Sequence, residues 1–160
     1  MVKIDLKLDK IDKKILEELQ KNSSISLSEL SKRVKLSNTP CWNRIKKLEE
    51  KKIIKSKEYI LDHKKINLPF IIFLNISIPN HTKLWLKNFE KIINKYDQII
   101  EVHRLTGSNK DYQITILSPS IEEYDKFQQI LIEEIECTNM SSHVSLQMIK
   151  KNYKYPLDFI

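Results

Sequence analysis

Apolar residues near the start of the chain recur at the spacing of one helix face. The positions, three or four residues apart, are occupied by Leu8, Ile11, Ile15 and Leu19. Such spacing is typical of an amphipathic helix. Asp9 stands where an N-cap is expected, and acidic residues in the first turn suit the helix dipole. The pattern predicts a first helix that begins after Asp9 and ends before Asn22.

Two shorter helices are predicted directly afterwards. Ser26 and Glu29 have the spacing of a capping box, which predicts a helix that ends near Leu36. Pro40 fits the first turn of the next helix, because the N–H that proline lacks is not needed there. The second and third helices are therefore joined by a tight turn.

The third helix is expected to have one apolar and one polar face. Its apolar face consists of Cys41, Ile45 and Leu48. The residues at its start and on its outer face include side chains that hydrogen-bond to base edges or contact phosphates, with Arg44 the candidate for a guanine edge. This predicted DNA-binding set consists of Ser37, Asn38, Thr39, Trp42, Asn43, Arg44, Lys46 and Lys47. The pattern indicates a helix-turn-helix at about 27–47. A three-helix bundle with a solvated basic face is the alternative that the pattern leaves open.

From residue 70 onward, strands alternate with helices. Strands are predicted at 70–78, 99–105, 112–117 and 143–149, and helices at 83–96 and 120–135. This βαββαβ order predicts a four-stranded antiparallel sheet with both helices on one face, the ferredoxin-like arrangement. Because such a sheet leaves its other face uncovered, we expect a homodimer through this domain.

These patterns define an α+β chain with two domains. Residues 1–62 are expected to form a winged helix-turn-helix domain, in which the extended stretch 58–61 is the candidate wing. Residues 63–69, closed by a proline, are expected to be a linker. Residues 70–160 are assigned to the ferredoxin-like domain.

The basic charge of the chain is confined to its first part. The net charge is +7. Residues 1–67 contain 18 Lys and Arg against 10 Asp and Glu, whereas residues 68–160 contain 10 against 11. This asymmetry indicates a module that binds a polyanion, joined to a neutral partner domain.

The only glycine of the chain, Gly107, lies in the predicted hairpin between strands 99–105 and 112–117. The chain has no Ala and 25 Lys, a composition that indicates a codon bias against Gly, so the remaining glycine is expected to need a positive φ or the absence of a Cβ. Backbone N–H groups of such a turn can hold a carboxylate and Asp111 can hold an ammonium, which together suit an amino acid. The predicted effector-binding set consists of Thr106, Gly107, Ser108, Asp111 and Tyr112. A plain hairpin whose loop backbone is satisfied by Asp111 is the alternative.

Catalytic and metal-binding motifs are not found. The two cysteines give no disulfide framework or metal spacing, the four histidines are scattered, and no nucleophile–base pair or phosphate loop is visible. We therefore expect neither an enzyme nor a cofactor. No apolar run approaches 18 residues and no signal peptide is recognisable, so a cytoplasmic location without a membrane span is expected.

Three stretches resemble the Lrp/AsnC family of bacterial and archaeal transcriptional regulators. LDKIDKKILEELQKN is similar to the opening helix of that family, and SLSELSKRVKLSNTPCWNRIKKLEEKKII to its helix-turn-helix. LTGSNKDY resembles its glycine–aspartate–tyrosine turn, and the βαββαβ order matches its effector-binding domain. The resemblance covers almost the whole chain.

The resemblance implies a sequence-specific, DNA-binding transcriptional regulator. Family members dimerise through the C-terminal sheets, often form octamers or other rings of dimers, and many respond to an amino acid bound near the glycine turn. One departure concerns that turn: the family turn usually has two residues between the glycine and the aspartate, and this chain has three, Ser108, Asn109 and Lys110. A ligand-independent architectural DNA-binding protein of the same fold is therefore the alternative function. A regulator that acts only on a protein partner is disfavoured by the basic first part.

Overall fold

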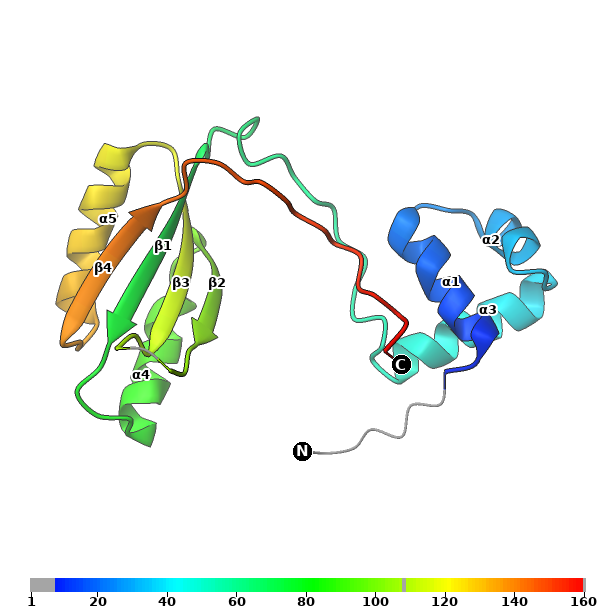
Figure 1. Cartoon of the computed structure of the whole chain (residues 1–160), viewed down its shortest axis with the longest axis horizontal. Coiled ribbons are helices and arrows are strands. Elements are labelled where there is room, and N and C mark those ends of the chain that lie inside the picture. Colours follow the sequence, from blue (N-terminus) through cyan, green and yellow to red (C-terminus); the bar gives the residue numbers. More distant parts are fainter. Residues whose placement is uncertain (1–7, 108, 160) are drawn as a thin grey trace. The chain divides into compact units, whose positions relative to one another are not determined.

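The computed structural model describes residues 8–107 and 109–159 (Figure 1). These residues form two compact units. The helical unit runs to Tyr59 and resumes at Ile149, and the sheet unit is Ile60–Met148. The elements in chain order are α1 (Lys10–Lys21), α2 (Leu27–Arg33), α3 (Asn38–Glu50), β1 (Phe70–Ser77), α4 (Lys83–Ile93), β2 (Ile99–Arg104), β3 (Tyr112–Ser118), α5 (Ile121–Glu134) and β4 (Asn139–Val144).

The helices begin where the capping residues predict. The Asp9 carboxylate accepts the N–H of Asp12 at 2.8 Å, and the Asp12 side chain accepts the N–H of Asp9, which completes a capping box. The hydroxyls of Ser26 and Ser120 each accept the N–H three residues further on. Ser37 is the N-cap of α3 but makes no side-chain capping bond.

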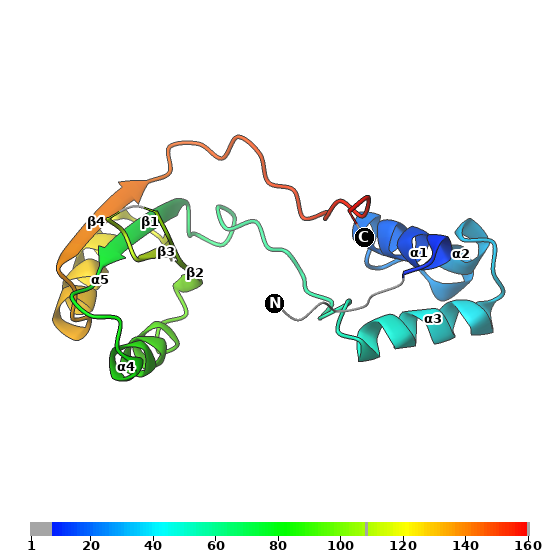
Figure 2. The same cartoon turned by 60° about the horizontal axis from the view of Figure 1, so that its bottom comes forward.

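The three helices of the helical unit enclose a small apolar core (Figure 2). The buried members are Ile15, Leu16, Leu30, Val34, Cys41 and Leu48. Cys41 is fully buried, and burial raises the pKa of its thiol. It therefore acts as a small core residue, as its position on the apolar face of α3 predicts.

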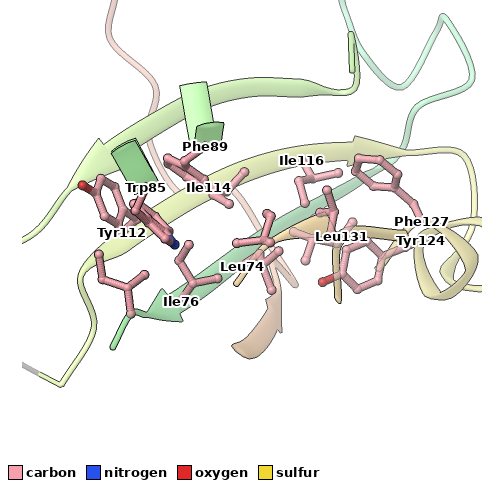
Figure 3. Packing of buried hydrophobic residues seen from close by; sticks show 13 residues of the cluster. Leu74, Ile76, Trp85, Phe89, Tyr112, Ile114, Ile116, Tyr124, Phe127 and Leu131 are labelled. Atoms are coloured by element: carbon pink, nitrogen blue, oxygen red, sulfur yellow. The ribbon is translucent and has the colours of Figure 1, made fainter. Parts of the chain in front are cut away.

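The four strands form an antiparallel sheet in the order β2-β3-β1-β4, and α4 and α5 pack on one face of it, as predicted. Side chains from alternate positions of β1 and β3 meet aromatic and aliphatic side chains of the two helices (Figure 3). The labelled members include Leu74, Ile76, Ile114, Ile116, Trp85, Phe89, Tyr124, Phe127 and Leu131. The single core cluster fixes which sheet face the helices cover.

Two predicted strands differ from the observed ones. The last strand is Asn139–Val144, not 143–149, because antiparallel pairing with β1 places Asn139 opposite Ser77 and Val144 opposite Ile72. The apolar alternation beyond Val144 therefore runs outside the sheet, and Leu146 is 98% exposed. The candidate wing at 58–61 forms no strand, since the described residues between α3 and β1 contain no regular element.

The end of the chain contacts the helical unit. Residues 70–160 are predicted as one domain, but the segment from Ile149 onward groups with the helical unit. Two hydrogen bonds between the Gln20 side chain and the Tyr155 backbone, with packing of Leu157 against the helical core, account for this grouping.

Candidate nucleic-acid interface and ligand-binding turn

The outer surface of α3 carries most of the predicted DNA-binding set. Burial of Cys41 and Leu48 orients the helix, so the opposite side faces solvent. The exposed members of the set are Ser37, Asn38, Thr39, Trp42, Asn43, Lys46 and Lys47. The structure thus brings seven of the eight predicted residues to the surface of one helix and its N-terminus.

Trp42 is the large apolar side chain of this surface. It is 49% exposed, and the ammonium of Lys46 lies 5.9 Å from its ring centroid. Lys46 also pairs with Glu49 at 2.7 Å. A half-exposed indole among cationic and amide side chains is suited to contact a charged partner surface.

Asn38 contributes to the contact between α2 and α3. Its side-chain oxygen accepts the Ser31 hydroxyl at 2.7 Å, within the turn that joins the two helices. Lys35 in that turn has a φ of 58°. The amide of Asn38 therefore has a partner inside the unit as well as an exposed position.

Arg44 differs from the other members of the set, because it is held by two carboxylates of α1 and its capping residue. Its Nη1 donates to Asp9 at 2.5 Å and to Asp12 at 2.7 Å. These carboxylates raise the pKa of Arg44, and the Asp12 N–H together with Arg44 lowers the pKa of Asp9. The guanidinium thus joins α3 to the start of α1. Helical periodicity placed Arg44 at the surface but could not reveal acidic partners more than thirty residues away.

A second charged contact joins α1 to α2. Glu18 accepts hydrogen bonds from Lys21 at 2.7 Å and Arg33 at 2.8 Å, and these interactions lower the pKa of Glu18 to about 2. Arg33 also pairs with Glu29 of its own helix at 2.5 Å. The two arginines of the helical unit therefore position helices, and the exposed cations of α3 are lysines.

Gly107 lies in the β2–β3 hairpin with a φ of 92°, which confirms the predicted need for a positive φ. Lys35, Lys52 and Asn67 also have positive φ, at 55–62°. Those angles fall in the left-handed region that non-glycine residues can enter, whereas 92° lies beyond it. The chain therefore uses lysine or asparagine where a side chain is tolerated and glycine where it is not.

Asp111 is tied to the end of β1. Its N–H donates to the carbonyl of Ile76, and its Oδ2 accepts the N–H of Ile78, both at 2.8 Å. His81 Nε2 lies 3.2 Å from Asp111 Oδ1. The carboxylate thus satisfies loop backbone, and one of its oxygens faces a side chain that a ligand could replace. No sequence pattern links His81 to Asp111, so this partner was missed.

The other members of the predicted effector-binding set differ in their exposure to solvent. Thr106 and Gly107 are exposed at the turn, and Ser108 lies outside the described residues. The Tyr112 ring is buried and lies 5.4 Å from Trp85 and 4.9 Å from Phe89, measured between centroids. Figure 3 shows its hydroxyl pointing away from the cluster.

Two hollows adjoin this turn. The first is lined by Ser77, Asn109, Lys110, Asp111, Thr138 and Asn139. The second is lined by His81, Thr82, Lys83, Trp85, Leu86, Arg104 and Tyr112. The first lining consists of polar and charged residues alone, whereas the second also includes the apolar side chains of Trp85 and Leu86.

Within the described residues, no three His, Cys, Asp or Glu side chains gather as a metal ion would require. The same residues include no helix that is long and apolar enough to cross a membrane.

Two protein-family models match the chain. Residues 8–55 match a winged helix-turn-helix DNA-binding domain, and residues 71–155 match the Lrp/AsnC ligand-binding domain. The chain belongs to the Lrp/AsnC family. It is a DNA-binding transcriptional regulator of that type, in agreement with the exposed surface of α3 and the α+β sheet unit.

Relatives that align with nearly the whole chain are also named as regulators. The chain is 36% identical over 151 residues to a glutamate uptake regulatory protein of Zymomonas mobilis, covering 94% of this chain and 92% of the relative. It is 30% identical over 152 residues to the DNA-binding transcriptional activator DecR of Escherichia coli, covering 94% and 99%. The Lrp/AsnC relatives are named as regulators, not as enzymes.

Solved Lrp/AsnC structures confirm the predicted fold class. An AsnC family transcriptional regulator from Agrobacterium tumefaciens is 35% identical with a TM-score of 0.90, covering 96% of this chain and 99% of that one. The transcriptional regulator NMB0573 from Neisseria meningitidis, solved as a complex with L-Met, is 30% identical with a TM-score of 0.89, covering 95% and 98%.

Proposed function

We propose that this regulator binds duplex DNA through α3 and that an amino acid bound at the Gly107 turn modulates the binding. The observation that carries the DNA-binding half is the exposed row of Trp42, Lys46 and Lys47 on a helix whose opposite face is anchored in the core. Lys46 and Lys47 contact phosphates, and Thr39 and Asn43 contact base edges. The protein works in the cytoplasm, where its DNA is.

Two copies act together on the DNA. Ile71, Phe73 and Leu117 lie at the strand positions that alternate with the core residues, so they face away from α4 and α5 and are only partly buried. A second copy covers this face, which also carries Asn75, Gln113 and Thr115, and forms a homodimer. Dimers of a helix-turn-helix protein read half-sites about 34–36 Å apart, so the target site has two-fold symmetry. Octamers built from such dimers are the larger assembly expected.

The effector is a free amino acid. The exposed backbone at Thr106 and Gly107 binds its carboxylate, and Asp111 binds its ammonium in place of His81. The L-Met complex of the Neisseria relative supports this class of ligand. Calorimetric titration with each amino acid tests it, and Asp111→Asn should abolish any heat of binding.

A ligand-independent architectural protein is the second candidate. The longer spacing between Gly107 and Asp111 and the use of the Asp111 carboxylate by backbone favour it. Absence of binding for every amino acid in the titration, with DNA binding retained, would establish this alternative.

Selection of bound fragments from genomic DNA tests the DNA-binding half. Recovery of symmetric sites is expected, and recovery of unrelated sequences would contradict sequence-specific recognition.

The same fragments test Arg44. A base-reading role predicts that Arg44→Ala reduces discrimination between bases by about 1–3 kcal/mol at one guanine position. An equal loss on every sequence would assign Arg44 to helix packing alone.

A further inference from the structure

A groove on the helical unit lies beside α1 and the segment that follows α3. Leu16, Leu19, Ile53 and Ile54 supply much of its apolar lining. The N–H groups of Ile53 and Ile54 both donate to the carbonyl of Leu48, at 2.9 and 3.2 Å, so this wall is fixed to the end of α3. The groove therefore adjoins both the core of the unit and its predicted DNA-binding helix.

The C-terminal segment forms another wall of this groove and is held there by a paired contact. Gln20 Nε2 donates to the Tyr155 carbonyl at 3.3 Å, and the Tyr155 N–H donates to Gln20 Oε1 at 2.5 Å. The side-chain amide thus satisfies both backbone groups of one residue, as a neighbouring strand would. Leu157 adds an apolar contact with the helical core.

The contact is confined to a short stretch. Leu146 and Phe159, on either side of it, are 98% and 89% exposed, whereas Leu157 is partly buried. The Tyr155 side chain is itself 80% exposed, so its recognition depends on backbone. One leucine and one backbone pair therefore define where the segment docks.

We propose that the surface around Gln20 is an intramolecular docking site for residues 153–157, and that the docked segment restrains the DNA-binding unit during duplex recognition. The second half rests on the proposed DNA-binding function. Residues 51–69 connect α3 to β1, and the segment after β4 returns to the helical unit, so the two units are joined by the chain twice. A second connection reduces the conformational freedom that binding must remove.

Trypsin cleavage after Lys154 tests docking in the full-length chain. Slow cleavage is expected in the wild type, and Leu157→Asp or Gln20→Ala should accelerate it several-fold because the segment is released. Phe159→Asp, in the same segment but outside the groove, should leave the rate unchanged. Equal cleavage rates in the wild type and Leu157→Asp would overturn the docking.

A cross-link identifies the source of the docked segment. Ser23 lines the groove and Tyr155 needs only its backbone, so both can be replaced by cysteine in a Cys137→Ser background, where Cys41 is buried. A short bis-maleimide should give a cross-linked monomer on a denaturing gel. A covalent dimer would show that the segment comes from a second copy and would overturn the intramolecular assignment.

Affinity for a selected DNA fragment tests the restraint. Leu157→Asp should weaken binding about tenfold without changing the salt dependence, because no phosphate contact is removed. Phe159→Asp should bind as the wild type does. Unchanged affinity of Leu157→Asp would remove the restraining role. Failure of the wild type to bind any DNA would instead contradict the proposed function, while the protease and cross-linking results still decide the docking.

Discussion

The helical and sheet units differ in how much they depend on ion pairs between elements. In the helical unit, ion pairs join separate helices: Glu18 with Arg33, and Arg44 with Asp9 and Asp12. The sheet unit also has such a pair between elements, Lys95 with Glu134 of α5, and its other anchoring groups include side chains that bind backbone. Trp85 Nε1 donates to the Glu136 carbonyl at 2.7 Å, and Asp111 accepts the N–H of Ile78. A small bundle without a sheet has no strand register to fix its geometry, so its apolar core and these charged pairs together position its helices.

The difference also explains where free positive charge is found. Acidic residues of the helical unit bind its two arginines, whereas Lys47 on α3 is exposed. The net excess of positive charge in the first part is therefore carried by exposed lysines, which include Lys46 and Lys47 of the predicted DNA-binding surface. The sheet unit has no such excess and instead presents the Gly107 turn and a sheet face that is partly apolar.

The largest effect is expected from Leu131→Ala in the sheet core. Leu131 is fully buried, and truncation of such a residue costs about 2–5 kcal/mol. Hydrogen exchange should accelerate throughout β1 and β3 but remain slow in α1, because the units have separate cores. Leu146→Ala, at an exposed site, is the matched control. Equal acceleration in α1 would mean that the two units unfold as one.

A smaller effect is expected when both exposed lysines of α3 are removed. Lys46→Ala with Lys47→Ala should weaken DNA binding at least about tenfold and reduce the slope of log affinity against log salt by about 2. Lys87→Ala with Lys91→Ala makes the same charge change in the sheet unit. Equal changes in both double variants would show that total charge, and not the surface of α3, determines binding.

Gly107→Val should destabilise the sheet unit by about 1–3 kcal/mol through backbone strain. A Cβ at Gly107 would meet no atom within 4 Å, so collision with neighbours is not the cause. Gly107→Asn should cost less, because asparagine tolerates positive φ better. Chemical denaturation of both variants measures the difference. Identical stability of the wild type and Gly107→Val would contradict the strain at this position.

The smallest effect is expected from Glu18→Gln, and this effect on stability should depend on pH. The lowered pKa of Glu18, about 2 against an ordinary value of 4.5, stabilises the helical unit above pH 4.5. This stabilisation is lost as the pH falls from 4.5 towards 2 and the carboxylate is protonated. The stability gap between the wild type and Glu18→Gln should therefore close over that range, as monitored by urea unfolding. Glu17→Gln, at an exposed neighbour, is the control, and a constant gap would exclude the charged contact as its source.

Much of the fold follows from local sequence signals. Caps such as Asp9 and Ser120, together with helical and strand periodicity, located the helices and three of the strands. The fourth strand was displaced because apolar alternation continues past Val144, and only pairing with β1 reveals where the sheet ends.

The site could be predicted less completely. The exposed face of α3 follows from periodicity, since Cys41 and Leu48 fix its orientation. The engagement of Arg44 and the return of Tyr155 to Gln20 depend on packing between residues far apart in the chain. Composition alone could not reveal either contact.

The two tryptophans of the chain fall one in each unit, Trp42 half-exposed on α3 and Trp85 only 9% exposed in the sheet core. Their intrinsic fluorescence should differ, with red-shifted emission from Trp42 and blue-shifted emission from Trp85. Single Trp→Phe variants would therefore provide a label-free optical reporter for each unit.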